Sequence, residues 1–108
     1  MEVSFEEFQN LDLRIGKVTA VEEIESSKNL YNLEVDFGTE KKQSVAGLKK
    51  HYSPQHLLNK KFVFVLNLER RKLMGMESEC MILAADDNEG NVVLLQPEKD
   101  IIEGSRIR

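Results

Sequence analysis

The chain has little material for covalent or metal chemistry. Its 108 residues include one cysteine, two histidines and no tryptophan. A single cysteine, Cys80, cannot form an internal disulfide, and the HExxH, CxxC, GxxxxGK[ST] and GxSxG patterns do not occur. His51 and His56 lack the further ligands that a zinc site needs. We therefore expect no enzyme activity, no metal and no cofactor.

The sequence also has no long apolar segment. No apolar run approaches the roughly 18 residues that a membrane span needs, and residues 1–4 lack the basic and apolar regions of a signal peptide. No Gly/Ser-rich or Pro-rich linker divides the chain. We therefore expect one domain over residues 1–108, located in the cytoplasm.

Charge is unevenly distributed along the chain. The net charge is −4, yet residues 41–72 contain nine cations and one acid, Glu69, a charge of +8 that leaves −12 for the rest. Because the Debye length is about 8 Å at physiological salt, acids on a far face do not cancel a basic face. The middle third therefore predicts an anionic partner, with a merely solvated surface as the alternative.

A short helix is expected at the N-terminus. Ser4-x-x-Glu7 fits a capping box, which predicts a helix over about residues 5–10. Phe5 and Phe8 lie on one side of it. Because so short a helix is marginal alone, these two rings need either the core or a partner subunit to pack against.

Three strands are expected to follow. Residues 13–23 are expected to form a long strand. Its apolar residues fall on odd positions at Leu13 and Ile15 and on even positions at Val18 and Ala20. Such a change at Gly16-Lys17 is typical of a β-bulge. Residues 31–37 alternate apolar and polar side chains, as a half-buried strand does. Residues 41–46 return as the third strand.

The second half predicts a short helix and further strands. Ser53-Pro54 opens the helix, since Ser is a favoured N-cap and Pro fits the first helical position. The apolar runs at 62–66 and 80–85 predict strands buried on both faces, and residues 92–95 pair back after a turn. A bent first strand and a helix between strands three and four are the OB-fold arrangement. The expected fold class is all-β, a five-stranded OB-fold barrel with short helices and a C-terminal β extension.

Several segments together resemble one known family. They are Asp12-Leu13-Arg14-Ile15-Gly16-Lys17-Val18, Asn67-Leu68, Arg71-Lys72-Leu73-Met74-Gly75-Met76-Glu77-Ser78-Glu79 and Met81-Ile82-Leu83-Ala84-Ala85. The chain is similar to the tRNA-binding domain family. That family includes the C-terminal domain or β subunit of methionyl-tRNA synthetase, free-standing dimeric tRNA-binding proteins and the CsaA-type export chaperone. The resemblance implies an OB fold, tRNA binding with little sequence specificity, and a homodimer built through the terminal segments.

The residues and the resemblance predict the same functional region. Arg70, Arg71 and Lys72 are expected to end the fourth strand, and few aromatic side chains beside many cations favour recognition of phosphates and shape over bases. Asn67 and Ser78 either bond to RNA or close a turn. The expected RNA contacts are Arg14, Lys17, Lys41, Lys42, Lys49, Lys50, Tyr52, Asn67, Arg70, Arg71, Lys72, Ser78 and Met81, and the expected dimer contacts are Phe5, Phe8, Ile101, Ile102 and Ile107.

The functional hypothesis is a non-catalytic tRNA-binding module that reads tRNA by shape and phosphate charge. Whether it assists a methionyl-tRNA synthetase in trans stays open. The alternative is a CsaA-type chaperone, in which an apolar cleft with Met74, Met76 and Met81 binds unfolded peptides.

Overall fold

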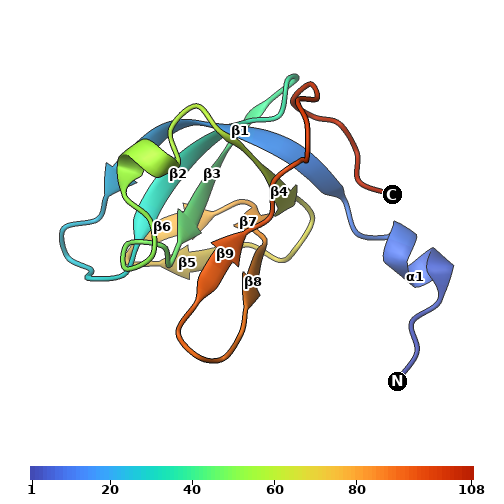
Figure 1. The fold of residues 1–108 in the computed structure, drawn as a ribbon, viewed down its shortest axis with the longest axis horizontal. Helices are drawn as coiled ribbons and strands as arrows, with labels where there is room; N and C mark the ends of the chain where they lie inside the picture. The colour runs from blue at the N-terminus through green and yellow to red at the C-terminus, as the bar shows by residue number, and fades with distance from the viewer.

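The computed structural model describes all 108 residues and consists mainly of strands (Figure 1). Five antiparallel strands form the main sheet in the order β3-β2-β1-β4-β7. They are β1 (Leu13–Glu23), β2 (Tyr31–Asp36), β3 (Lys41–Ala46), β4 (Lys61–Val65) and β7 (Met81–Ile82). The predicted alternation of β2 is confirmed: Tyr31, Leu33 and Val35 are buried, whereas the residues between them are not.

Strand β1 bends the sheet, but its bulge is not where the sequence predicted it. The pairing with β2 shifts between Val18 and Ala20, so Thr19 is the extra residue. Gly16 faces the core instead, because a Cβ there would meet the side chain of Val35. The predicted bulge at Gly16-Lys17 is therefore wrong. The apolar residues change from odd to even positions because the first half of β1 is buried on both faces: Ile15 and Gly16, which are neighbours in the strand, are both buried.

Backbone and side-chain hydrogen bonds close the barrel between β3 and the segment before β7. The backbone N–H of Glu79 donates to the carbonyl oxygen of Gln43 at 2.8 Å. The Ser44 hydroxyl donates to the carbonyl oxygen of Cys80 at 3.0 Å, and the N–H of Val45 donates to Ser78 Oγ at 3.0 Å. The barrel is thus nearly closed, and the outer edge of β3 is not left as an open strand edge.

Two short helices lie outside the sheet. The helix α1 (Phe5–Gln9) has the predicted capping box, in which Ser4 Oγ accepts from the N–H of Glu7 at 3.1 Å. The 3-10 helix η1 (Pro54–His56) lies between β3 and β4, with Ser53 at its N-cap position. Neither helix has the length and apolar character needed to cross a membrane.

Two hairpins extend the barrel and correct two predictions. The hairpin β5 (Arg71–Leu73) and β6 (Met76–Ser78) turns at Met74-Gly75, where both φ angles are positive, 51° and 80°. Arg70, Arg71 and Lys72 therefore do not end the fourth strand, since β4 ends at Val65.

The second hairpin consists of β8 (Ala84–Asp86) and β9 (Val92–Leu94). The continuous buried strand predicted over 80–85 is therefore wrong. It is interrupted at Leu83, and Met81 on one side and Ala84 on the other are exposed. The N–H of Leu83 donates to the carbonyl oxygen of Val63 at 3.0 Å, after which the chain leaves the main sheet.

The C-terminal tail runs beside the first half of β1. The N–H of Gly104 donates to the carbonyl oxygen of Ile15 at 2.8 Å, and the N–H of Ile107 donates to that of Leu13 at 2.9 Å. The tail thus extends the sheet where β2 has ended. With this β extension, the five-stranded barrel and the short helix between β3 and β4, the fold is the predicted OB fold.

Candidate nucleic-acid interface

A cleft opens between β3, the linker from β4 to β5, the β5–β6 hairpin and β7. We call it the barrel cleft. Its floor is mostly apolar, and an arginine and two carboxylates give it a charged rim. Three of the predicted RNA contacts, Arg71, Ser78 and Met81, belong to it. The lining residues are Val45, Leu68, Glu69, Arg71, Leu73, Ser78, Glu79, Cys80 and Met81.

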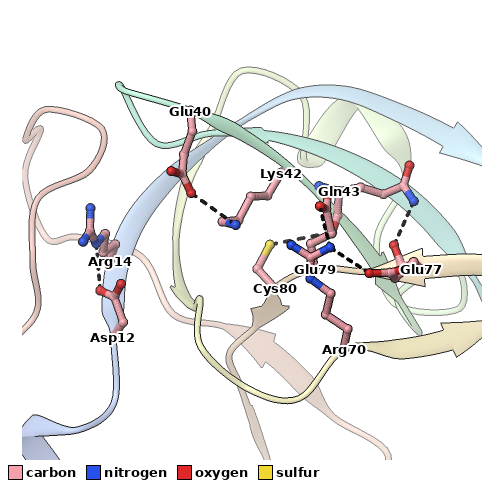
Figure 2. A network of polar contacts seen from close by, with 9 residues as sticks. All are labelled: Asp12, Arg14, Glu40, Lys42, Gln43, Arg70, Glu77, Glu79 and Cys80. Carbon is pink, nitrogen blue, oxygen red and sulfur yellow. Dashed lines mark hydrogen bonds and ion pairs between the residues drawn. The ribbon is translucent and has the colours of Figure 1, made fainter.

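Arg70, the residue before β5, is paired with two carboxylates, those of Glu77 and Glu79 (Figure 2). Its Nη1 lies 2.8 Å from Glu77 Oε1 and 3.5 Å from Glu79 Oε2. The hydrogen bond to Glu77 raises the pKa of the Arg70 guanidinium. By contrast, Arg71 and Lys72 form no ion pair and are exposed. The two free cations of the hairpin are therefore Arg71 and Lys72.

The cations at the start of β3 are paired at the surface. Lys41 Nζ lies 3.5 Å from Glu34 Oε1, and Lys42 Nζ lies 3.2 Å from Glu40 Oε1. The Lys41–Glu34 pair is exposed, and such a pair contributes only about 0–1 kcal/mol, so an RNA phosphate can replace this carboxylate at small cost. The Lys42 side chain is only 19% exposed. These two lysines are outside the barrel cleft and line a separate hollow over β1, β2 and β3.

Arg14 is paired more closely than the β3 lysines. Its Nε donates to Asp12 Oδ1 at 2.7 Å, and this hydrogen bond is the main cause that raises the pKa of Arg14. The structure therefore shows Arg14 in an ion pair with Asp12. Contact of Arg14 with RNA stays a prediction.

Lys49 and Tyr52 hold the fold together. Lys49 Nζ donates to the carbonyl oxygens of Ile24 at 3.3 Å and Ser27 at 3.0 Å, which fastens the loop 24–29. The Tyr52 hydroxyl accepts from the N–H of Leu94 at 3.1 Å, and its half-buried ring packs against the core. Lys50, next along the chain, is exposed and forms no ion pair.

Asn67 and Ser78 also make the structural bonds that the sequence left open for them. Asn67 Oδ1 accepts from the N–H of Asp12 at 2.8 Å, and its Nδ2 donates to the carbonyl oxygen of Asn10 at 2.6 Å. Ser78 Oγ accepts from Val45 and donates to the carbonyl oxygen of Cys80 at 3.1 Å. Both side chains thus position neighbours of the cleft, and their contact with RNA stays a prediction.

The thiol of Cys80 lies at the bottom of the cleft and is buried. Burial raises its pKa to about 12. A thiol that stays protonated at neutral pH is a poor nucleophile. Cys80 therefore contributes packing here.

Several cleft residues were not among the expected contacts. Leu68 and Leu73 flank the cationic run at 70–72 on either side, and Val45 comes from β3. Of the three methionines assigned to an apolar cleft, Met81 lines it, while Met74 is exposed at the hairpin tip. The signal that could have located the cleft was the pair of leucines around the cations.

The predicted dimer contacts fall into two groups on the surface. Phe5, Phe8 and Ile107 line one apolar hollow together with Leu11. No residue of α1 is buried, and Phe5 is 70% exposed. Ile101 and Ile102 lie apart from that hollow in the chain segment before the tail, where Ile102 is 72% exposed.

Comparison with protein families identifies the domain. The model described as "Putative tRNA binding domain" matches residues 13–106. Methionine–tRNA ligase of Thermococcus onnurineus is 52% identical over 106 residues, which are 98% of this chain and 14% of the ligase. The ligase of Methanocaldococcus jannaschii is 50% identical over 100 residues, 93% of this chain and 15% of the ligase. The chain thus spans about a seventh of the length of these curated relatives.

Solved structures agree with this assignment over the whole chain. A MetRS-related protein from Pyrococcus horikoshii has a TM-score of 0.94 at 35% identity, and each chain is covered completely. The chaperone CsaA from Bacillus anthracis has a TM-score of 0.89 at 38% identity, again over both complete chains. The chain therefore belongs to the tRNA-binding domain family.

Proposed function

We propose that residues 1–108 form a single non-catalytic module that binds tRNA by its shape and its phosphate charge. The observation that carries the proposal is that two cations, Arg71 and Lys72, form no ion pair with a carboxylate. Both lie on the hairpin that forms one wall of the barrel cleft. Cations on this hairpin neutralise phosphates and release counterions, which gives affinity without reading bases.

The shape of the cleft supports recognition of a folded RNA. Tyr52, an aromatic residue within the basic segment 41–72, packs against the core, so it offers no free stacking platform of the kind that single-strand binders use. An apolar floor with Arg71 at its rim suits a partly exposed base or ribose edge held by phosphate contacts beside it.

The relatives suggest a setting for this module. The matched ligases are named for charging tRNA with methionine, and this chain corresponds to about a seventh of their length. We propose that it raises the affinity of a synthetase for tRNA, either in trans or as part of a longer chain, in the cytoplasm. Binding energy from a linked module adds to that of the catalytic part through effective concentration.

The apolar surface at the termini supports a homodimer. Phe5, Phe8 and Ile107 line one hollow, and α1 has no buried residue in the single chain. Exposed large apolar side chains gathered in this way mark a contact surface. A second copy of the chain would cover them and place two barrel clefts on one assembly.

The decisive experiment is fluorescence-anisotropy binding of bulk tRNA across a salt series. Single-stranded RNA and an unstructured peptide serve as competitors. We expect salt-steep binding that single-stranded RNA competes poorly. Absence of tRNA binding, with the peptide bound instead, would overturn the proposal.

A second candidate function has its own supporting observation. Five of the nine residues lining the barrel cleft are apolar, and Met81 in it is 44% exposed. A cleft of that composition can take apolar side chains of an unfolded peptide, as a chaperone requires. This alternative predicts peptide binding that changes little between low and high salt.

A further inference from the structure

A second cation-lined hollow lies at the other end of β4 from the barrel cleft. Four lysines and two carboxylates surround it, and Pro97 is the one apolar side chain in its lining. We call it the lysine hollow. Its lining residues are Lys17, Asn59, Lys60, Lys61, Gln96, Pro97, Glu98, Lys99 and Asp100.

Backbone pairing brings Lys17 and Lys60 to the same end of the β1–β4 ladder. Lys17 lies opposite Lys61 in the β1–β4 register. The N–H of Val18 donates to the carbonyl oxygen of Lys60 at 2.9 Å, and the N–H of Asn59 donates to that of Val18 at 2.7 Å. Asn59 has a φ of 65°, a left-handed conformation that asparagine tolerates better than most residues. The turn before β4 therefore fixes Lys60 opposite Val18, one residue along β1 from Lys17, and both lysines line the hollow.

Lys61 brings the fourth lysine to the same hollow. Its Nζ lies 2.7 Å from Asp100 Oδ1, 2.7 Å from the carbonyl oxygen of Ile101 and 3.0 Å from Glu103 Oε1. These bonds fasten the segment that carries Lys99 to the start of β4. The charge of Lys61 is thereby neutralised by ion pairs within the fold.

The other three lysines keep their charge free. Lys17, Lys60 and Lys99 form no ion pair, and Lys60 and Lys99 are exposed. The unpaired acid of the lining is Glu98. Four lysines and two acids give the lining a net charge of 4 − 2 = +2, which attracts an anion. An adjoining hollow that shares Lys60 and Gln96 adds the exposed side chains of His51 and His56.

We propose that the lysine hollow is a second RNA-phosphate site, occupied by the backbone of the tRNA whose other part lies at the barrel cleft. Four residues of β4 at about 3.3 Å each separate the two sites by about 13 Å. One phosphate cannot reach both, so the two sites hold different phosphates of the same RNA. This inference rests on the proposed tRNA-binding function.

The test is the salt dependence of tRNA binding for Lys60→Ala/Lys99→Ala. Neither side chain has a carboxylate partner, so we expect an unchanged melting temperature. The slope of log affinity against log salt should become shallower by about one to two units, because each lost phosphate contact removes released counterions. Lys28→Ala, an exposed lysine outside both hollows that forms no ion pair, is the charge control and should change the slope less.

The outcomes separate this inference from the proposed function. If the wild-type chain binds tRNA and Arg71→Ala/Lys72→Ala flattens its slope, while Lys60→Ala/Lys99→Ala matches the Lys28→Ala control, the lysine hollow is not a phosphate site. If the wild-type chain shows no salt-dependent tRNA binding, the proposed function itself is overturned. A flattened slope in both double variants supports two separate sites.

Discussion

Gly16 lies so close to Val35 that a Cβ at position 16 would come within 2.5 Å of Val35 Cγ1. Phe37 and Phe64, whose rings pack edge to face with centroids 5.4 Å apart, would be 2.6 Å and 2.9 Å from it. We expect Gly16→Ala to lower the free energy of unfolding by about 1–3 kcal/mol, because overpacking displaces fully buried rings.

Gly47→Ala is the matched control for that variant. A Cβ at position 47 would meet nothing within 4 Å. We expect its free energy of unfolding to stay within about 0.5 kcal/mol of wild type. Urea unfolding followed by circular dichroism measures both. Equal stability of the two alanine variants would contradict the close packing at Gly16.

The free cations of the β5–β6 hairpin carry the second prediction. We expect Arg71→Ala/Lys72→Ala to weaken binding uniformly across tRNA species and to flatten the salt slope by about one to two units. Arg70→Ala should change the slope less, since Arg70 is already paired with Glu77 at 2.8 Å. Anisotropy titrations at several salt concentrations measure these slopes, and an unchanged slope in the double variant would remove the hairpin from the site.

The buried thiol of Cys80 carries a prediction about pH. Its folded pKa of about 12 is raised above the reference value of 9.0. At pH 8 the thiolate fraction should therefore be about a thousandfold lower in the folded chain than in the unfolded one, and alkylation should be slowed at least to that degree.

The same shift gives the sign of the stability effect. Because the folded pKa is raised, the contribution of the neutral thiol is fully present below about pH 9 and is lost as the pH rises toward 12. Iodoacetamide labelling of native and urea-unfolded protein tests the accessibility. Equal labelling rates would show that Cys80 is neither buried nor protonated.

Asn67 links the segment after α1 to the strand linker after β4. Its amide accepts from Asp12 at 2.8 Å and donates to Asn10 at 2.6 Å. We expect Asn67→Ala to cost about 1 kcal/mol of unfolding free energy, since two exposed hydrogen bonds return to water. Asn29→Ala, whose side chain makes no hydrogen bond in the fold, is the control and should be close to neutral in thermal unfolding.

The apolar hollow at the termini predicts the oligomeric state. We expect the wild-type chain to sediment as a dimer at micromolar concentration and Phe5→Glu to sediment as a monomer, because Phe5 is 70% exposed in the single chain. Leu58→Glu changes an exposed leucine outside that hollow and should leave the dimer intact. A wild-type monomer would sink the dimer proposal.

Local patterns determined much of the fold in advance. Strict alternation over 31–37 predicted β2 because a half-buried strand repeats every two residues. The Ser4–Glu7 pair predicted the start of α1, because a capping box satisfies backbone donors within three residues. Interactions between residues so close together in the chain can be predicted from the sequence alone.

The candidate site was predicted less well, for reasons that are also physical. The cationic run at 70–72 was singled out from the sequence, but its place on a separate hairpin depends on the left-handed turn at Met74-Gly75. Methionine gives no signal for a positive φ, since it rarely adopts one. The bulge at Thr19 was likewise invisible, because the register between β1 and β2 decides it.

By itself, the sequence determined the OB-fold class, the family and the sign of the charge in the middle third. Only the tertiary structure decided which cations are free and where they meet. Lys60 and Lys99 share one hollow because Lys61 binds Asp100, a partner 39 residues away. Charge count is a property of the chain, whereas pairing depends on distances that only folding creates.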